Sequence, residues 1–484
     1  MYNGQCQSLT KAGLQVLEPG TEAYTEREAS YFSRSSQLKP ICYVQPRDAA
    51  EVASALAILV KDTTCNFAIR SGGHMVWAGA NNSPLVDNGV TIDLGLMNQT
   101  EYDTERKIAK IGSGARWADV YRSLEPFKVT VAGGRASSVG VGGFLTGGGN
   151  NFFSTKYGFG CDNVVNFEVV LASGKVVNAN AKENPNLFKA LKGGSGNFGI
   201  VTRFDMRAIE GVTSLWGGAV VYPADDATTS QHIAAFTNWV RDAHAYPAGT
   251  IVPFWAYTPA AGEIQILWMT ADTSGRDWAS TPAYDEFRAI EPRLAVHLRH
   301  DSLRNMTKSF DQPGDLYHVW CTMTFKNDAR VMRRAVDMHA ALIAQWKAEV
   351  ASDPDFTNYL IFQPMPRVVF ERAAEQGGNV LGMDPERLGG ADAVLIQVQM
   401  WINTPELEAK ARELITKFRL ELQQYSVEAG AGVDWEYINY ADHTQDPIRT
   451  YGAANVAFMR EVSAKYDPEQ VFQKRARAGF KLPE

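Results

Sequence analysis

Residues 70–74 read Arg-Ser-Gly-Gly-His and bring together a cation, a histidine and two adjacent glycines. Glycines adopt backbone angles that are closed to other residues, and they leave amide groups uncovered for an anion to approach. The apolar residues 67–69 predict a short buried strand, so residues 70–74 form the loop that follows it. We therefore predict that His74 lies where a phosphate-bearing ligand could be held. A tight turn with an incidental arginine and histidine would give the same pattern.

Two tyrosines near the C-terminus, Tyr437 and Tyr440, are separated by Ile438 and Asn439. In an extended segment Tyr437 and Asn439 would share one face, and Tyr440 would take the other. One face could then meet a cofactor while the other meets a substrate. A phenol has a pKa of about 10, so as a base it needs a lowered pKa or concerted proton transfer. Ordinary packing is the alternative explanation for this spacing.

Two further segments are rich in glycine. Residues 132–149 hold so many glycines that a helix or strand would be costly, which predicts loops lying against a group that needs close backbone approach. Val139 and its apolar neighbours make a disordered linker a poor explanation. Residues 194–199 match G-x-G-x-x-G, but they follow a helical pattern and precede a strand, the reverse of the dinucleotide fingerprint. We therefore reject an NAD-binding Rossmann unit.

The elements that position these segments follow from apolar spacing. Residues 40–46 and 67–69 predict strands around a helix at 49–60, and residues 117–124 predict another helix. Residues 1–40 are polar and indicate an N-terminal arm. Beyond about residue 209 the composition shifts to aromatics and longer helices, and alternating strands predict an antiparallel sheet with one face lining a cavity. The predicted strands of this half are residues 216–222, 264–270, 318–325 and 394–402.

Composition limits the class of protein. The 484 residues are 45% hydrophobic and 21% charged, typical of a globular protein. A net charge of −7 without a basic block argues against nucleic acid or anionic membrane as a partner. No apolar run approaches the ~18 residues that span a bilayer, and the histidines lack metalloenzyme spacing, so no metal is expected. We expect a soluble chain, cytoplasmic as written or secreted if a signal was removed; oligomeric state is not predicted.

Residues 70–74 resemble the attachment segment of berberine-bridge-enzyme-like FAD-linked oxidases, which have a PCMH-type FAD-binding domain in the vanillyl-alcohol oxidase superfamily. The resemblance continues through residues 132–149, 157–164, 194–201 and 436–442. In that family the histidine that closes the segment is bonded to the 8α-methyl group of FAD, which implies a bond from His74. Bicovalent members use a second cysteine at the place of residues 135–136, where this chain has none, so attachment through His74 alone is implied.

The resemblance also implies the fold and the cofactor contacts. It implies an α+β fold with an FAD-binding domain at residues 1–208 and 432–484 and an inserted substrate domain at residues 209–431. It implies a disulfide between Cys6 and Cys65, from which an oxidising compartment would follow. The implied FAD contacts are Arg70, Ser71, Gly72, Gly73, His74, Gly133, Gly134, Ser137, Ser138, Val139, Gly142, Gly143, Thr146, Gly148, Tyr157, Gly158, Cys161, Asp162, Val164, Gly196, Gly199, Ile200, Val201 and Asn439.

The implied reaction is an oxidase reaction. The second tyrosine of the family's Tyr-x-Asn-Tyr motif serves as base in several relatives, which makes Tyr440 the candidate base, with Tyr437 beside it. Other relatives use a glutamate on the substrate sheet; here Gln397 and Gln399, with Gln363, can only orient a substrate. The expected substrate is a small aromatic, alkaloid-like or polyketide-like metabolite that gives hydride to flavin N5. The reduced flavin is then reoxidised by O2, which gives H2O2. A carbohydrate oxidase and a non-redox cyclase that keeps FAD as a scaffold remain alternatives.

Overall fold

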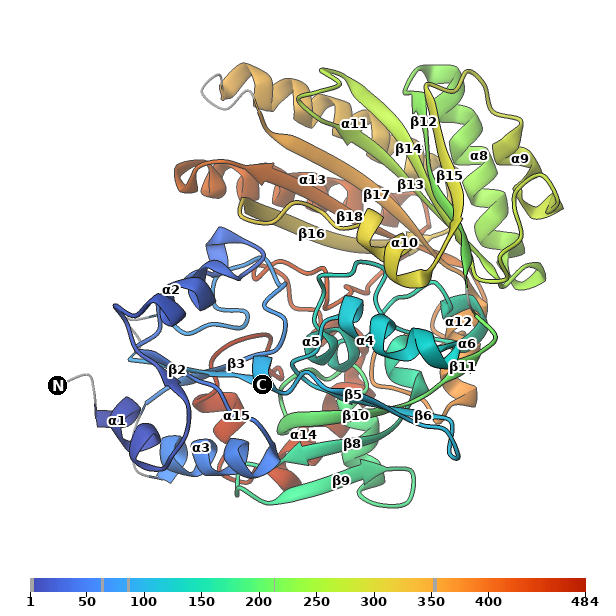
Figure 1. Ribbon diagram of the computed structural model, residues 1–484. Helices are drawn as coiled ribbons and strands as arrows, with labels where there is room; N and C mark the ends of the chain where they lie inside the picture. Colours follow the sequence, from blue (N-terminus) through green and yellow to red (C-terminus); the bar gives the residue numbers. More distant parts are fainter. Residues whose placement is uncertain (1–3, 62–64, 85–87, 213, 351–354) are drawn as a thin grey trace.

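The computed structural model describes residues 4–61, 65–84, 88–212, 214–350 and 355–484. Figure 1 shows two layers: a lower layer built from the N-terminal and C-terminal parts of the chain, and an upper layer built from the middle. The upper layer has its own hydrophobic core, whereas the main core of the lower layer also includes buried residues of the upper sheet, such as Leu215, Ala271 and Leu395. This arrangement confirms the α+β fold with an antiparallel sheet and flanking helices.

A four-stranded sheet in the lower layer positions the His74 loop. The strand order is β1 (Val16–Leu17), β2 (Cys42–Val44), β4 (Val90–Asp93) and β3 (Phe67–Arg70), with β2 and β3 parallel to β4. The predicted helix is α3 (Ala49–Lys61), so the strand–helix–strand unit is confirmed. Residues 4–40, predicted as an N-terminal arm, contain α1 (Gly4–Lys11) and α2 (Glu22–Ala29), and they are tied to the sheet because β1 pairs with β2.

A five-stranded antiparallel sheet completes the lower layer. Its order is β5 (Thr100–Asp103), β6 (Ile108–Gly112), β10 (Ile200–Arg207), β8 (Val164–Val170) and β9 (Val176–Asn180), with the helices α4 (Trp117–Leu124) and α7 (Pro185–Leu191). The expectation that residues 132–149 form only loops is partly wrong, because α5 (Val141–Thr146) is a short helix. Gly142 in this helix packs directly against the His74 loop, because a Cβ on Gly142 would lie only 2.9 Å from the Ser71 side chain.

The upper layer is an eight-stranded antiparallel sheet. Its order is β15 (Ala295–Asp301), β12 (Leu215–Pro223), β14 (Ile264–Asp272), β13 (Gly249–Tyr257), β17 (Thr357–Met365), β18 (Ala393–Ile402), β16 (Tyr317–Lys326) and β19 (Gly432–Val433). The helices α8 (Asp226–Asp242), α11 (Ala329–Glu349) and α13 (Glu408–Glu428) cover one face (Figure 1). The four predicted strands are confirmed as β12, β14, β16 and β18.

Short elements connect the layers, and the C-terminal segment returns to the lower one (Figure 1). The remaining helices and strands are α6 (Ser154–Tyr157), α9 (Asp285–Arg288), α10 (Leu303–Ser309), α12 (Arg367–Glu375), α14 (Ala453–Tyr466), α15 (Val471–Lys474), β7 (Val129–Thr130) and β11 (Ile209–Glu210). A bridge joins Phe67 to Ala476 beside the His74 loop. The predicted domain boundaries at residues 209 and 432 stay a prediction. Strand β11, which begins at residue 209, pairs with β7 of the lower layer, and β19, which begins at residue 432, pairs with β16 of the upper layer.

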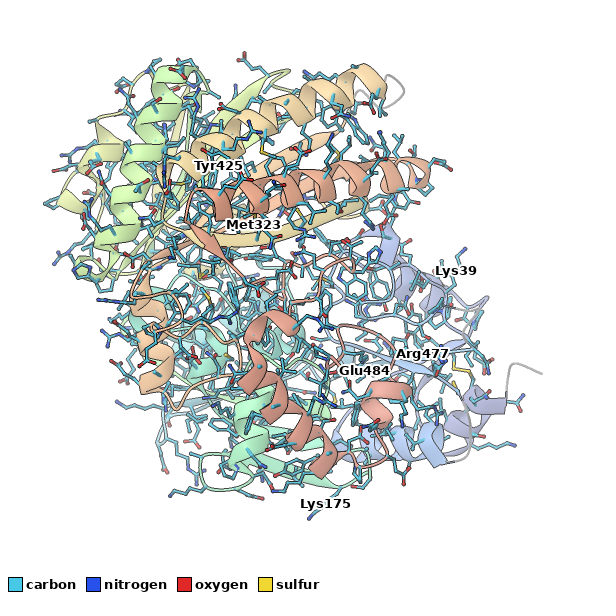
Figure 2. The ribbon with its side chains drawn as sticks, turned by 180° about the vertical axis from the view of Figure 1, so that it is seen from behind. Lys39, Lys175, Met323, Tyr425, Arg477 and Glu484 are labelled. Atoms are coloured by element: carbon cyan, nitrogen blue, oxygen red, sulfur yellow. A yellow bond between two sulfur atoms is a disulfide. The ribbon has the colours of Figure 1, made fainter. Side chains whose placement is uncertain are left out.

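The disulfide differs from the one that the resemblance implied. Cys6 is bonded to Cys42, with their Cα atoms 6.2 Å apart, and the bond is visible in yellow in Figure 2. The reason is packing, because α1 lies against β2, on which Cys42 is the first residue. The Cys65 thiol is instead hydrogen-bonded to the backbone oxygens of Asn66 and Asn88. Within the described ranges, no helix is long and apolar enough to cross a membrane.

Candidate active site

A cavity of about 360 Å³ lies between the two layers, within the range of ligand pockets. The lower layer supplies the His74 loop, the glycine-rich segments and the C-terminal tail. The upper layer supplies side chains of β13, β14, β17, β18 and β16. The cavity is thus the place where the predicted FAD segments meet the predicted substrate sheet.

His74 lines this cavity in a packed and polar setting. Its ring stacks on Phe32, with centroids 3.9 Å apart and planes inclined by 12°. Its Nε2 lies 3.2 Å from Ser138 Oγ. Burial lowers the pKa of His74 to about 3, and the nearby Arg116 guanidinium and His318 act in the same direction. The imidazole is therefore neutral at physiological pH, the state in which its nitrogen can act as a nucleophile.

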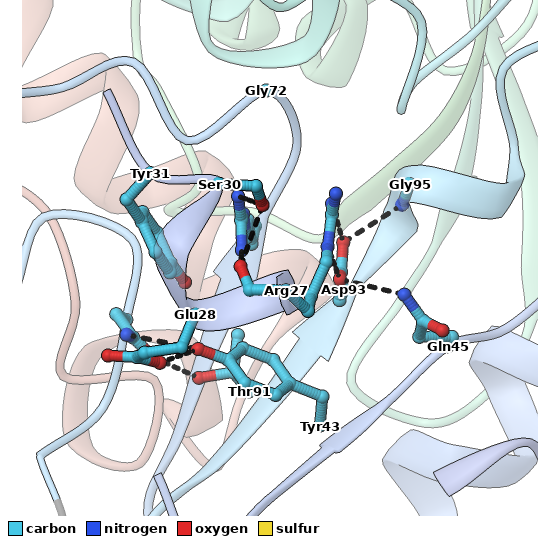
Figure 3. Close-up of polar contacts among 12 residues, drawn as sticks. Arg27, Glu28, Ser30, Tyr31, Tyr43, Gln45, Gly72, Thr91, Asp93 and Gly95 are labelled. Carbon is cyan, nitrogen blue, oxygen red and sulfur yellow. Dashed lines mark hydrogen bonds and ion pairs between the residues drawn. The ribbon is translucent and has the colours of Figure 1, made fainter. Parts of the chain in front are cut away.

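Arg70 holds the loop but does not line the cavity. Its guanidinium is fully buried, donates to the Arg27 carbonyl and to Ser30 Oγ at 2.8 Å each, and stacks 3.6 Å over the Tyr31 ring. Arg27 in turn pairs with Asp93, as Figure 3 shows. The structure therefore does not support direct contact between Arg70 and FAD. The arginine fixes the turn that presents the next four residues.

The glycines leave space that suits a flat cofactor. A Cβ on Gly143 or Gly196, both in the lining, would meet no atom within 4 Å, so these two glycines open onto the cavity. Gly72 serves a different purpose, because a Cβ there would lie 2.5 Å from the Gly140 Cα. The backbone at Gly72 therefore packs directly against the backbone at Gly140. These residues fit a group such as FAD, whose binding needs exposed amides and close backbone approach.

Lys481 was missed by the sequence analysis. It lines the cavity from the C-terminal tail, and its Nζ donates to the Phe472 carbonyl at 3.0 Å. Burial lowers the pKa of this amine to about 7. A lysine in that setting is readily protonated when an anion arrives beside it. No motif surrounds Lys481 in the sequence, so nothing in the sequence indicated that it lies in the cavity.

Tyr440 lies in a polar cluster at the substrate side. Its hydroxyl accepts a hydrogen bond from Arg135 Nη2 at 2.9 Å and lies 3.4 Å from Gln363 Oε1, to which it donates. Arg135 also donates to Gln363 Oε1, and Asn150 Nδ2 does so at 3.0 Å. Neither Arg135 nor Asn150 was predicted as a site residue.

Tyr437 lies beside Tyr440, with the two rings 4.9 Å apart and nearly perpendicular. The expected opposite faces are wrong because the segment is a turn, in which the Tyr440 N–H donates to the Tyr437 carbonyl at 2.9 Å. The Tyr437 hydroxyl oxygen accepts from the backbone N–H groups of Gly149 and Asn150 at 2.8 Å and from Asn439 at 3.2 Å. Burial raises the pKa of Tyr437 well above its ordinary value. It is therefore suited to fixing the glycine-rich loop.

The upper wall combines amides with apolar side chains. Gln399 Oε1 accepts from Gln312 at 2.9 Å, and Gln397 Nε2 is buried with no partner among the described residues. Trp320 Nε1, also in the lining, has none in the same part of the chain. Such orphaned donors indicate a ligand that supplies the acceptor. The apolar part of the lining includes Phe152, Val252, Phe254, Met269, Phe310 and Ile361.

The cavity gathers most of the predicted residues, and the others lie behind them. The predicted residues in the lining are Ser71, Gly72, Gly73, His74, Gly134, Val139, Gly142, Gly143, Thr146, Gly196, Gly199, Ile200, Val201, Gln363, Gln397, Gln399, Tyr437, Asn439 and Tyr440. Those outside it are Arg70, Gly133, Ser137, Ser138, Gly148, Tyr157, Gly158, Cys161, Asp162 and Val164. Residues 157–164 support the glycine-rich loop from behind: the backbone N–H groups of Gly160 and Cys161 donate to the carbonyls of Gly149 and Gly148 at 2.7 and 2.8 Å.

Comparison with known proteins identifies the class. Residues 40–180 match the family model described as an FAD binding domain. The chain is 38% identical over 480 residues to the FAD-dependent monooxygenase sdcF of Emericella nidulans, covering 99% of this chain and 98% of that protein. It is 36% identical over 487 residues to the FAD-dependent monooxygenase drtC of Aspergillus calidoustus, covering 99% of this chain and 90% of that protein.

Solved structures share the fold. The berberine-bridge-enzyme-like protein 1 of Physcomitrella patens superimposes with a TM-score of 0.78 at 19% identity, covering 99% of each chain. The glucooligosaccharide oxidase of Acremonium strictum superimposes with a TM-score of 0.79 at 18% identity, again over 99% of each chain. The FAD of that oxidase is described as 6-S-cysteinyl and 8α-N1-histidyl.

The fold, the cavity and these relatives define an FAD-linked oxidoreductase. The chain belongs to the family of these fungal FAD-linked proteins, with a PCMH-type FAD-binding domain and the berberine-bridge-enzyme-like fold. The resemblance noted from residues 70–74 is thereby confirmed, and FAD is its cofactor.

Proposed function

We propose that this protein is an FAD-linked oxidase that takes hydride from a small, largely apolar metabolite and uses O2 as electron acceptor. The observation that carries the proposal is the hydroxyl of Tyr440, which lies in the cavity between Arg135 and Gln363. A phenol beside a cation can lose its own proton, and the phenolate is then placed to receive a proton from substrate. No other group of the polar cluster can serve as a base, since its remaining members are an arginine and amides.

Each side chain of the cluster has a separate task in this proposal. Bound FAD would supply the hydride acceptor at N5 and pass two electrons to O2. Tyr440 first gives its own hydroxyl proton to solvent, and as the phenolate it takes the proton of the substrate O–H or N–H as hydride leaves the adjacent carbon. The Arg135 guanidinium stabilises the phenolate, the form of Tyr440 that can accept this proton. Gln397 and Gln399 orient the substrate.

The wall of the cavity favours an apolar substrate. Phe152, Phe254, Phe310 and Ile361 offer apolar surface, whereas a sugar needs many hydrogen-bonding partners around its ring. The described part of the lining offers three glutamines on the sheet side. This composition fits an aromatic or polyketide-like metabolite better than an oligosaccharide.

FAD attachment is proposed through His74 alone. His74 is neutral and lines the cavity, while residues 135–136 offer no thiol. Cys161 is a poor substitute, because it is fully buried outside the lining and burial raises the pKa of its thiol. Lys481 is proposed as the partner of an FAD phosphate, since it places a protonatable amine in the cavity.

The test is a screen for substrate-dependent peroxide. The probes are 4-hydroxybenzyl alcohol, a tetrahydroisoquinoline amine and cellobiose, each assayed for H2O2 and for flavin bleaching without oxygen. The proposal predicts bleaching by an aromatic probe and one H2O2 per product. In Tyr440→Phe, the bleaching rate should fall by about 10²-fold or more. Tyr425→Phe, on α13 of the upper layer (Figure 2), should match the wild type.

Three outcomes would contradict the proposal. Product formed without O2 consumption would favour a cyclase. Oxygen from ¹⁸O2 in the product would favour monooxygenation, the activity in the names of the relatives sdcF and drtC. Faster reduction by cellobiose than by the aromatic probes would favour a carbohydrate oxidase.

A further inference from the structure

His74 begins a chain of hydrogen bonds that links the lower layer to the upper layer. Its Nε2 lies 3.2 Å from Ser138 Oγ, and this Oγ donates to Asp311 Oδ1 at 2.9 Å. The Ser138 backbone N–H donates to the same carboxylate oxygen at 3.0 Å, and the Ser137 hydroxyl donates to the other oxygen. Asp311 follows α10 of the upper layer. The carboxylate is thus held by three donors from residues 137 and 138.

These contacts determine where the imidazole carries its hydrogen. A carboxylate only accepts, so the one hydroxyl hydrogen of Ser138 is used in the bond to Asp311. Ser138 Oγ must then accept from His74, which places the imidazole hydrogen on Nε2. Nδ1 is left with the nucleophilic lone pair.

We propose that Ser138 and Asp311 form the route by which His74 loses its proton while it bonds to FAD. The inference rests on the proposed attachment through His74. As Nδ1 bonds to the 8α carbon, Nε2 gives its hydrogen to Ser138 Oγ, and Ser138 gives its own hydrogen to Asp311. In net terms one hydrogen leaves the imidazole, one leaves the 8α-methyl group, and both pass with two electrons to O2, giving H2O2.

The surroundings explain why such a route is needed. Without loss of the Nε2 hydrogen, bond formation at Nδ1 would leave a cationic ring in the cavity. The site opposes that charge, because burial and the nearby Arg116 guanidinium hold the pKa of His74 near 3. Arg116 is fixed there by donating to the Gly72 carbonyl at 3.0 Å. Ser138 touches the reacting imidazole, whereas Asp311 acts through Ser138 and is a positioning residue.

The experiment compares covalent attachment in full-length variants loaded with FAD. The variants are Ser138→Ala, Asp311→Asn and Asp311→Glu, and the matched control is Ser137→Ala, which loses a bond to the same carboxylate but has none to His74. Attachment is followed by the intact mass of denatured protein, which rises by FAD less two hydrogens. Tightness of non-covalent FAD binding and thermal melting are measured in parallel.

We expect attachment in Ser138→Ala and Asp311→Asn to slow by about 10²-fold, with FAD still bound. Ser137→Ala should stay within about threefold of wild type, and Asp311→Glu should recover part of the lost rate. In Asp311→Asn the remaining rate should rise with pH, because hydroxide must then take the proton. A merely structural aspartate would not produce that pH dependence.

The proposed proton route would be wrong if Asp311→Asn attached FAD at the wild-type rate. It would also be wrong if Ser137→Ala and Ser138→Ala lost the same fraction of the attachment rate. If Asp311→Asn fails to fold, Ser138→Ala against Ser137→Ala decides the question. A wild-type protein with no covalent FAD would overturn it as well. Failure of the oxidase proposal would instead appear as absence of substrate-dependent peroxide from protein that carries covalent FAD.

Discussion

Replacement of Arg135 by glutamine tests the assignment of Tyr440 as the base. Arg135 Nη2 donates to Tyr440 Oη over 2.9 Å, so the guanidinium lies in contact with the atom that is proposed to receive the proton. Glutamine keeps a polar side chain but loses the positive charge. We expect the rate of hydride transfer to fall while the affinity for substrate changes little, because the guanidinium supports the phenolate form of Tyr440 that takes the proton.

The expected size follows from the type of bond. Hydrogen bonds to a charged group contribute about 1.5–3 kcal/mol, which corresponds to about a 10- to 150-fold loss in rate. The control is Asn150→Ala, because Asn150 donates to Gln363 Oε1 at 3.0 Å, as Arg135 does, but has no bond to Tyr440. Its effect should be below about threefold, in keeping with a neutral hydrogen bond at the edge of the cluster.

The assay is anaerobic stopped-flow reduction with the fastest aromatic probe, over a range of probe concentrations. Arg135→Gln is measured in the wild-type and Tyr440→Phe backgrounds. In Tyr440→Phe the loss caused by Arg135→Gln should disappear, because no phenol oxygen remains to be stabilised. An equal loss in both backgrounds would refute the reasoning, and so would an effect carried entirely by probe affinity.

Three further predictions concern the supports of the site. Tyr437→Phe removes the acceptor of two buried backbone N–H groups and should lower the free energy of unfolding by about 1–3 kcal/mol, measured in urea. Non-covalent FAD affinity, measured in His74→Ala, should be flat below pH 7 and fall up to about tenfold per pH unit above it, because binding must then protonate Lys481. Cys42→Ser should lower stability by about 4 kcal/mol, from the 36-residue separation, and make melting insensitive to reductant.

Each of these predictions has a contrary result. An unchanged urea midpoint in Tyr437→Phe would mean that water replaces the lost acceptor. A pH dependence that persists in the Lys481→Met, His74→Ala double variant would assign the proton to another group. Equal melting temperatures of wild type with and without reductant would show that the disulfide does not contribute to stability.

Local sequence was sufficient where a few neighbouring residues decide the structure. The turn at residues 70–74 needs its glycines, since Gly73 has a φ of +67° and Gly72 touches Gly140 through backbone. The alternation along β18 placed Gln397 and Gln399 in the lining as expected. Strand β13 was missed because residues 251–257 are all apolar and include a proline, so no alternation is visible in its sequence.

Contacts between distant segments could not be predicted. Arg135 meets Tyr440 across 305 residues of chain, and Ser138 meets Asp311 across 173. Their side chains look like ordinary polar residues in the sequence and acquire a role only when the two layers pack together. The error for Tyr437 had a local cause, because a turn replaced the extended segment on which the two faces were assigned.

The central claim is an FAD-linked enzyme whose cofactor is bonded to His74. The most direct measurement is the absorbance and intact mass of acid-precipitated, SDS-denatured wild type beside His74→Ala. The account predicts that flavin colour and the mass of FAD less two hydrogens stay with the wild-type chain and are lost in the variant, with the bond mapped to the peptide that contains His74. A colourless wild-type chain, or colour that persists in His74→Ala, would contradict it.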